Sequence, residues 1–299
     1  MLSINIPVYQ IEISELVLQL NAQAEKLDIP YEIRIYDDGS TSEIKEMNYR
    51  IGSLPNVVYK ELEKNLGRAA IRNKMGQDSR YRYLLFIDAD SHIICENYLS
   101  DFIKNIKSNR VICGGTAYQK ETPKESEKLL RWVYGTKREA ISAQSRNSKK
   151  GFIITSNNFM IEKSVLEKIP FREDLKNYGH EDTLLGYDLY QGKIEIFHIN
   201  NPVEHTGLED SAIFLEKTKM ALRNLRFISR NLLGDNPEFL KQVHFLNRYK
   251  AIAKFFPSLF LRWIYKISNS WIEKNLTGKK PCLFLFNLYK LTFYSTLIK

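Results

Sequence analysis

Carboxylates are the residues of this chain best suited to chemistry, and the most suggestive of them form the triplet Asp88-Ala89-Asp90. The triplet follows the apolar run Leu84-Leu85-Phe86-Ile87, so both carboxylates come directly after a predicted buried strand. Mg²⁺ and Mn²⁺ prefer oxygen ligands, and such an ion neutralises the charge of a diphosphate. An ordinary turn at a strand end is the alternative. The strand context favours a metal site.

Two other predicted strands also end in polar residues. Leu2–Val8 leads to Tyr9, and Tyr31–Tyr36 leads to the Asp37-Asp38 pair, which opens a strong turn signal. Strands that alternate with helices over about 100 residues predict a parallel sheet, which binds ligands at the carboxyl ends of its strands. We therefore predict an α/β fold with its ligand site at that edge. The other predicted strands are Val57–Tyr59, Tyr83–Ile87, Val111–Gly115, Phe152–Thr155 and Ile194–His198, and the predicted helices are Ile13–Leu27, Gly67–Met75, Ser164–Ile169, Glu181–Tyr190 and Ala212–Leu233.

Six segments, in order along the chain, resemble those of the inverting family 2 glycosyltransferases, which have the GT-A fold. The resemblance covers roughly residues 1–210 and implies a Rossmann-like, mostly parallel central sheet flanked by helices, followed by a helical extension over 211–299. The segments are Ile6-Pro7-Val8-Tyr9, Tyr36-Asp37-Asp38-Gly39-Ser40-Thr41, Asn65-Leu66-Gly67-Arg68 with Arg72-Asn73, Phe86-Ile87-Asp88-Ala89-Asp90, Ser156-Asn157-Asn158-Phe159-Met160-Ile161 and Gly179-His180-Glu181-Asp182.

The resemblance implies a nucleotide-sugar site. An aspartate at a strand end can accept the uracil N–H, with a turn former as the alternative for Asp38 and a structural role expected for Asp37. Arg72 suits phosphate or base-edge contacts, and its alternative is a buried ion pair with an aspartate of the same sheet. Asp88 is expected to face the ribose or a metal-bound water. The implied donor-site residues are Pro7, Tyr9, Asp38, Asn65, Gly67, Arg72 and Asp88.

The resemblance also implies the catalytic base and the metal ligands. Asp182 is the expected base, and Glu181 would orient it or bind the acceptor; the alternative is a pair of helix-start acids without chemistry. A helix N-terminus favours their anionic form. Asp90 and His205 are the expected ligands of Mn²⁺ or Mg²⁺, although a lone histidine is often a surface or core residue. His92 and His180 are weaker candidates.

The C-terminal region is basic and aromatic. Residues 241–299 contain eleven Lys or Arg and one acid, Glu273, which leaves +10, so the rest of the chain sums to −1. The same segment holds 13 of the 36 aromatic residues. This composition suits an anchor on an anionic membrane surface, and the alternative is a helical subdomain that packs its aromatics on the core. No recognition motif points to nucleic acid.

The location expected from the sequence is cytoplasmic, with peripheral association at the inner face of the cell membrane. Cys95, Cys113 and Cys282 are far apart and show no disulfide or zinc spacing, which fits a reducing compartment. We find neither a signal-peptide pattern nor an apolar run of about 18 residues.

The expected function is metal-dependent, inverting transfer of one hexosyl or N-acetylhexosaminyl group from a UDP-sugar to a hydroxyl of a glycan or lipid-linked glycan, in polysaccharide or glycolipid assembly. A processive synthase is disfavoured because Lys128-Leu129-Leu130-Arg131-Trp132 precedes the Glu-Asp pair and lacks the glutamine of Gln-x-x-Arg-Trp. A nucleotidyltransferase is a second interpretation, although the segment after the first strand lacks a Gly-rich basic loop. A non-catalytic sugar-nucleotide or glycan-binding protein on the same fold is the third.

Overall fold

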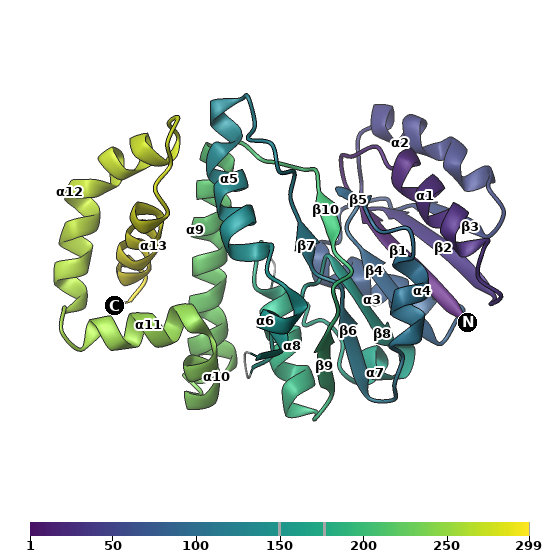
Figure 1. Ribbon diagram of the computed structural model, residues 1–299. Helices are drawn as coiled ribbons and strands as arrows, with labels where there is room; N and C mark the ends of the chain where they lie inside the picture. Colours follow the sequence, from purple (N-terminus) through teal and green to yellow (C-terminus); the bar gives the residue numbers. More distant parts are fainter. Residues whose placement is uncertain (149–150, 176–177, 299) are drawn as a thin grey trace. The chain divides into compact units, whose positions relative to one another are not determined.

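The computed structural model describes residues 1–148, 151–175 and 178–298, which form two compact units (Figure 1). We call them the sheet unit (Met1–Gln119, Glu139–Lys176 and Glu181–Gly207) and the helical unit (Lys120–Arg138, Asn177–His180 and Leu208–Lys299). The sequence places the segment 120–138 in the first domain, whereas its contacts group it with the C-terminal helices.

A seven-stranded sheet organises the sheet unit, in the order β3-β2-β1-β4-β8-β6-β9. Neighbouring strands run parallel except at β8, which is antiparallel to both β4 and β6. This arrangement confirms the predicted α/β class with a mostly parallel sheet. The strands are β1 (Leu2–Val8), β2 (Tyr31–Asp37), β3 (Val57–Glu61), β4 (Tyr83–Ile87), β6 (Arg110–Cys113), β8 (Asn158–Glu162) and β9 (Glu195–His198).

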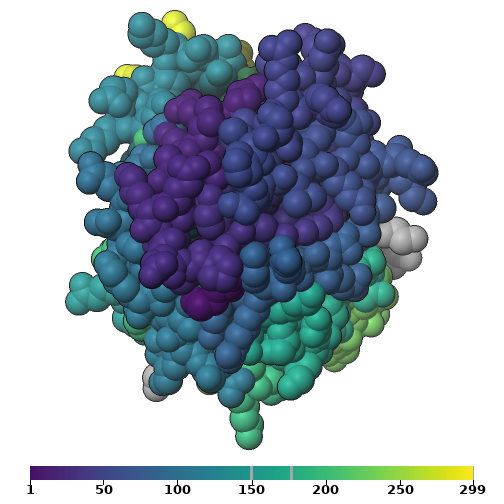
Figure 2. All heavy atoms as spheres, turned by 90° about the vertical axis from the view of Figure 1, so that its right-hand side faces the viewer, coloured from purple at the N-terminus to yellow at the C-terminus, as the bar shows by residue number. Residues whose placement is uncertain are grey.

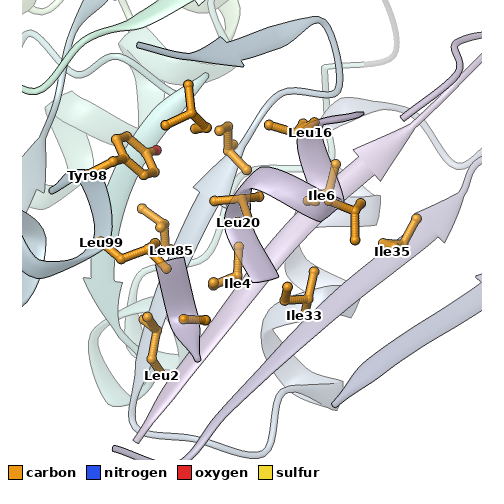
Figure 3. Packing of buried hydrophobic residues seen from close by; sticks show 14 of the residues in the cluster. Leu2, Ile4, Ile6, Leu16, Leu20, Ile33, Ile35, Leu85, Tyr98 and Leu99 are labelled. Atoms are coloured by element: carbon orange, nitrogen blue, oxygen red, sulfur yellow. The ribbon is translucent and has the colours of Figure 1, made fainter. Parts of the chain in front are cut away.

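Helices cover both faces of this sheet, and an apolar cluster is buried on each face. On one face, Leu16 and Leu20 of α1 (Ser14–Ala24) pack over Ile4 and Ile33, and α4 (Tyr98–Lys104) completes this core (Figure 3). The other face packs against α3 (Arg68–Asp78), α7 (Lys163–Lys168) and α8 (Glu181–Gln191). Side chains of the N-terminal segments, purple and blue, lie closely beside one another in Figure 2. Two further helices of the unit are α2 (Ser42–Tyr49) and α6 (Ala143–Ser148).

A second sheet, with three short strands, includes the segment that follows β4 in the chain. It consists of β5 (Ser91–Ile93), β10 (Val203–His205) and β7 (Thr116–Ala117), in that order. In the β5–β10 pair, His205 lies opposite Ser91, the residue after the Asp88-Ala89-Asp90 triplet. This short pairing brings together segments that are more than one hundred positions apart in the sequence.

The predicted strand at Phe152–Thr155 is wrong, because the strand in this region is β8. Phe152 and Ile154 are buried although their segment is irregular. An apolar sequence pattern therefore does not distinguish a buried irregular segment from a strand. β8 begins at a fully buried asparagine, Asn158, whose amide group donates to the backbone oxygens of Gly115 and Asn201 and accepts from the Tyr98 hydroxyl. These hydrogen bonds allow a polar side chain to be fully buried at the start of the strand. A search for apolar residues therefore does not find where β8 begins.

The helical unit has its own aromatic core. Phe214 of α9 stacks on Phe286 of α13, beside the buried Leu130 and Ile272. No helix in the described part of the chain is both long and apolar enough to cross a membrane. The helices are α5 (Leu129–Tyr134), α9 (Ser211–Phe227) with a π-helical turn at Ile228–Leu232, α10 (Pro237–Gln242), α11 (His244–Ala253), α12 (Ser258–Leu276) and α13 (Leu283–Thr296).

Candidate active site

The candidate site lies where β1, β2 and β4 end, and the register of the sheet brings these ends together. Val8 at the end of β1 pairs with Asp37 at the end of β2, and the backbone N–H of Asp38 donates to the Val8 oxygen at 2.8 Å. Pro7 is the penultimate residue of β1, and the ring of Tyr9, one residue beyond the strand, is 56% exposed. An exposed aromatic ring beside this edge is free to stack on a planar ligand.

Asp38 fixes the loop that leads into α3. Its two carboxylate oxygens accept hydrogen bonds from the backbone N–H groups of Leu66 at 2.7 Å and Gly67 at 3.1 Å. Burial raises the pKa of Asp38, and the two backbone hydrogen bonds act against this increase. Each oxygen keeps one further lone pair, so Asp38 can both hold the loop and accept a hydrogen bond from a ligand.

Asp37, Asn65 and Gly67 shape the backbone around Asp38. Asp37 accepts from the Ser40 backbone N–H at 2.7 Å, which is the turn-forming role expected of it. The exposed Asn65 donates its side-chain amide to the Asp38 backbone oxygen at 3.0 Å. Gly67 has φ +85°, a conformation that favours glycine, and a Cβ there would meet no atom within 4 Å. The backbone at Gly67 is therefore open to a ligand.

Arg72 and Asp88 form an ion pair whose arginine is buried and whose aspartate is partly exposed. The Arg72 Nη2 atom lies 2.6 Å from Asp88 Oδ1, and Nη1 donates to the backbone oxygen of Arg68 at 3.1 Å. The Arg72 side chain is 2% exposed, whereas that of Asp88 is 22% exposed. This is the ion pair that the sequence left open as the alternative for Arg72. The buried arginine therefore holds the Asp88 carboxylate in place at the rim of the site.

Asp90 and His205, the two residues expected to bind a metal, face each other. His205 Nδ1 lies 3.3 Å from Asp90 Oδ2, and both side chains are partly exposed. Within the described ranges no group of three or more His, Cys, Asp or Glu side chains could hold a metal ion. The Asp90 carboxylate alone still fits Mg²⁺, which commonly binds one or two carboxylates together with substrate phosphates and water. The His205 imidazole is a plausible further ligand for Mn²⁺.

The loop after β10 supports Asp90, and sequence reasoning missed it. Thr206 donates both its backbone N–H, at 2.9 Å, and its hydroxyl, at 3.0 Å, to the Asp90 backbone oxygen. A Cβ on Gly207 would lie 2.7 Å from Asp90 Oδ2, so only glycine leaves this carboxylate in place. The Tyr118 ring packs edge-on against His205 with centroids 5.6 Å apart. Apart from the glycine itself, no local pattern indicated these contacts.

Glu181 and Asp182 open α8, as predicted. Burial, and next the neighbouring charge of Glu181, raise the pKa of Asp182 to about 6, although hydrogen bonds from Thr183 and the charge of Arg72 lower it. Desolvation and like charge thus outweigh the expected effect of the helix N-terminus. A carboxylate with this pKa is ionised at neutral pH and is a stronger base than an ordinary aspartate.

The helix α3 connects the two acidic parts of the site. Arg72 pairs with Asp88 and acts electrostatically on Asp182, and Arg68 Nη1 lies 3.6 Å from Glu181 Oε1. His92 is directed elsewhere, because its Nδ1 atom lies 3.2 Å from Glu15 of α1. Arg68 and Arg72 therefore connect Asp88 with the Glu181-Asp182 pair, whereas Asp90 lies next to His205.

A family model described as glycosyl transferase family 2 matches residues 3–170. No curated protein sequence matches the chain.

The solved structure of a mannosyltransferase shares the fold at low sequence identity. The mannosyltransferase PcManGT from Pyrobaculum calidifontis, in complex with GDP-Man and Mn²⁺, is 13% identical, with 97% of this chain and 85% of that chain covered and a TM-score of 0.58. TarS from S. aureus is 18% identical, with a TM-score of 0.48 over 77% of this chain, which spans 40% of the length of that protein. Its fragment 1–349 in complex with UDP-GlcNAc is 17% identical, with a TM-score of 0.49 over 98% of this chain and 89% of the fragment.

Proposed function

Because the chain belongs to glycosyl transferase family 2, and is thus a glycosyltransferase of the GT-A fold, we propose that it transfers one sugar from a UDP-sugar with inversion. The acceptor is a hydroxyl of a glycan or lipid-linked glycan in polysaccharide or glycolipid assembly. The proposed transferred group is a hexose or an N-acetylhexosamine. The protein would work in the cytoplasm, at the inner face of the cell membrane.

The observation that carries the proposal is the cluster of carboxylates at the carboxyl ends of the parallel strands. Asp38 follows β2, and Asp88 and Asp90 follow β4, at the edge where such sheets bind nucleotides. Asp38 remains able to accept the uracil N–H, and the exposed Tyr9 offers a ring for stacking. Pro7, Asn65 and Gly67 shape the same edge, and Gly67 leaves the backbone open to the ligand.

Mn²⁺ or Mg²⁺ would be held by Asp90 and His205, whose ligand atoms lie 3.3 Å apart. When bound, such an ion neutralises the diphosphate and makes it a better leaving group. GDP-Man and Mn²⁺ accompany PcManGT, which supports a nucleotide sugar and a divalent ion for this shared fold. Arg72 and Asp88 contribute a fixed charge pair beside the ribose and diphosphate.

Asp182 is the proposed general base. Its pKa of about 6 leaves it ionised at pH 7, so it can take the proton of the acceptor hydroxyl. As that oxygen forms its bond to the anomeric carbon, the bond from this carbon to the diphosphate oxygen breaks and UDP leaves. Attack opposite the leaving group inverts the anomeric centre. Glu181, paired with Arg68, would position Asp182 or bind the acceptor.

The test is release of nucleoside diphosphate by the full chain with Mn²⁺, measured over a panel of UDP- and GDP-sugars. We expect turnover with a UDP-sugar, a product of inverted anomeric configuration by NMR, and a loss of roughly 100-fold or more in Asp90→Ala. The matched control is Asp101→Ala, which removes an aspartate of α4 that pairs with Lys104. Donor binding without turnover of any donor would contradict the proposal, as would near-normal activity of Asp90→Ala.

A further inference from the structure

Helix α12 of the helical unit exposes large apolar side chains along one face. We call this face, formed by Leu259, Phe260, Trp263, Ile267 and Trp271, the α12 surface. Trp263 and Trp271 are 55% and 63% exposed, and Leu259 is 73% exposed. Four of the five residues recur at intervals of four, so they line one side of the helix. A contiguous apolar surface of this kind marks an interaction site.

The α12 surface is separate from the face by which α12 packs in its own unit. Leu261, Ile272 and Leu276 are at most 3% exposed, and the last two belong to the buried core shared with α13. The helix therefore already has an apolar packing face. The second one, on the exposed side, is not explained by the folding of the helical unit.

The charges of α12 are distributed unequally between these faces. Lys266 and Lys274 are exposed and fall on the same side of the helix as the α12 surface. The one acid of α12, Glu273, is partly exposed but already paired, since it accepts from the Tyr289 hydroxyl at 2.7 Å and lies 3.5 Å from Lys219 Nζ. The α12 surface is thus flanked by two lysines, and the one acid of the helix is held by partners in α9 and α13.

The segments next to α12 continue the same composition. Phe255 is 80% exposed, and Phe256 stacks on Phe260 with ring centroids 5.8 Å apart. Exposed lysines stand at both ends of this region, Lys250 and Lys254 before α12 and Lys279 and Lys280 after it.

We propose that the α12 surface lies on an anionic lipid bilayer, with its aromatic side chains in the headgroup layer and its lysines at the lipid phosphates. Tryptophan and phenylalanine on one face of a helix, with lysines beside them, suit insertion at this depth. A second copy of the chain fits less well, because a two-fold pairing would bring the lysines of both copies together. The inference goes beyond the transfer reaction and does not depend on the donor site.

The experiment is flotation of the full chain with vesicles of phosphatidylcholine alone and of phosphatidylcholine with phosphatidylglycerol. We expect binding to the anionic vesicles only, and less of it at high salt. Each lysine near the surface contributes about a fivefold increase in partitioning, so Lys266→Gln with Lys274→Gln should weaken binding roughly 25-fold. Trp263→Ser with Trp271→Ser should abolish it.

Matched controls come from exposed residues of the sheet unit. Lys26→Gln with Lys168→Gln removes the same charge, and Tyr49→Ser removes an aromatic side chain that is 70% exposed. Both should float like the unmodified chain. Failure of the full chain to bind anionic vesicles would overturn the inference, as would binding unchanged in the α12 variants. A dimer in sedimentation that Trp263→Ser with Trp271→Ser dissociates, without vesicle binding, would assign the surface to a second copy instead.

Discussion

Replacing Asp182 by asparagine should stabilise the folded protein at high pH while abolishing transfer. In the folded chain its pKa is about 6 instead of 3.8, chiefly because of burial and then because of Glu181. This difference corresponds to about 3 kcal/mol. The folded state holds the proton more tightly than the unfolded chain, so the free energy of unfolding falls as the pH rises from about 4 to about 6. Above that window the folded protein carries the full cost of the charge.

The measurement is the thermal unfolding of Asp182→Asn and of the unmodified chain at pH 4 and pH 8. At pH 8 the variant should melt several degrees higher, since up to about 3 kcal/mol of charge burial is removed. At pH 4 the two proteins should melt together, because the Asp182 carboxyl is then protonated. A variant that is less stable than the unmodified chain at pH 8 would refute the assignment of a raised pKa.

The same group should control the activity profile. Below pH 6, kcat/KM should fall about tenfold per pH unit as the base is protonated. Glu181→Gln removes a charge that raises the pKa of Asp182, so in that variant the acid limb should move to lower pH. An acid limb that stays in place would show that it belongs to another group.

Two further substitutions probe the donor side of the site. Gly207→Ala places a Cβ 2.7 Å from Asp90 Oδ2, so we expect a higher Mn²⁺ concentration for half-maximal activity. Gly234→Ala strains the backbone at φ +56°, but its Cβ meets no atom within 4 Å, so the Mn²⁺ dependence of this variant should be unchanged. Equal Mn²⁺ dependence in both variants would contradict this reasoning. Arg72→Met should destabilise the fold by about 1.5–3 kcal/mol, because it leaves the partly exposed Asp88 carboxylate without its cation. Adding Asp88→Asn should recover part of that loss in denaturant unfolding. A double variant as unstable as Arg72→Met alone would argue against this ion pair.

Much of the site follows from local sequence signals. Apolar runs before Tyr9 and Asp88 and an alternating, β-rich segment before Asp37 predicted three strands of the sheet. Parallel strands gather the residues that follow them at one edge. The start of α8 at Glu181 was also predicted, because an acidic first turn precedes an apolar helical pattern. These features depend on residues a few positions apart, which a sequence displays directly.

Other features were decided only by packing between distant segments. The sequence named Asp90 and His205 separately, and the pairing of β5 with β10 placed them 3.3 Å apart. The sequence left two roles open for Arg72, and in the fold its guanidinium pairs with Asp88. It assigned Asp182 an environment that favours charge, whereas burial beside Glu181 made the pKa rise. Desolvation and close approach depend on what surrounds a side chain in three dimensions, and no spacing along the chain specifies that.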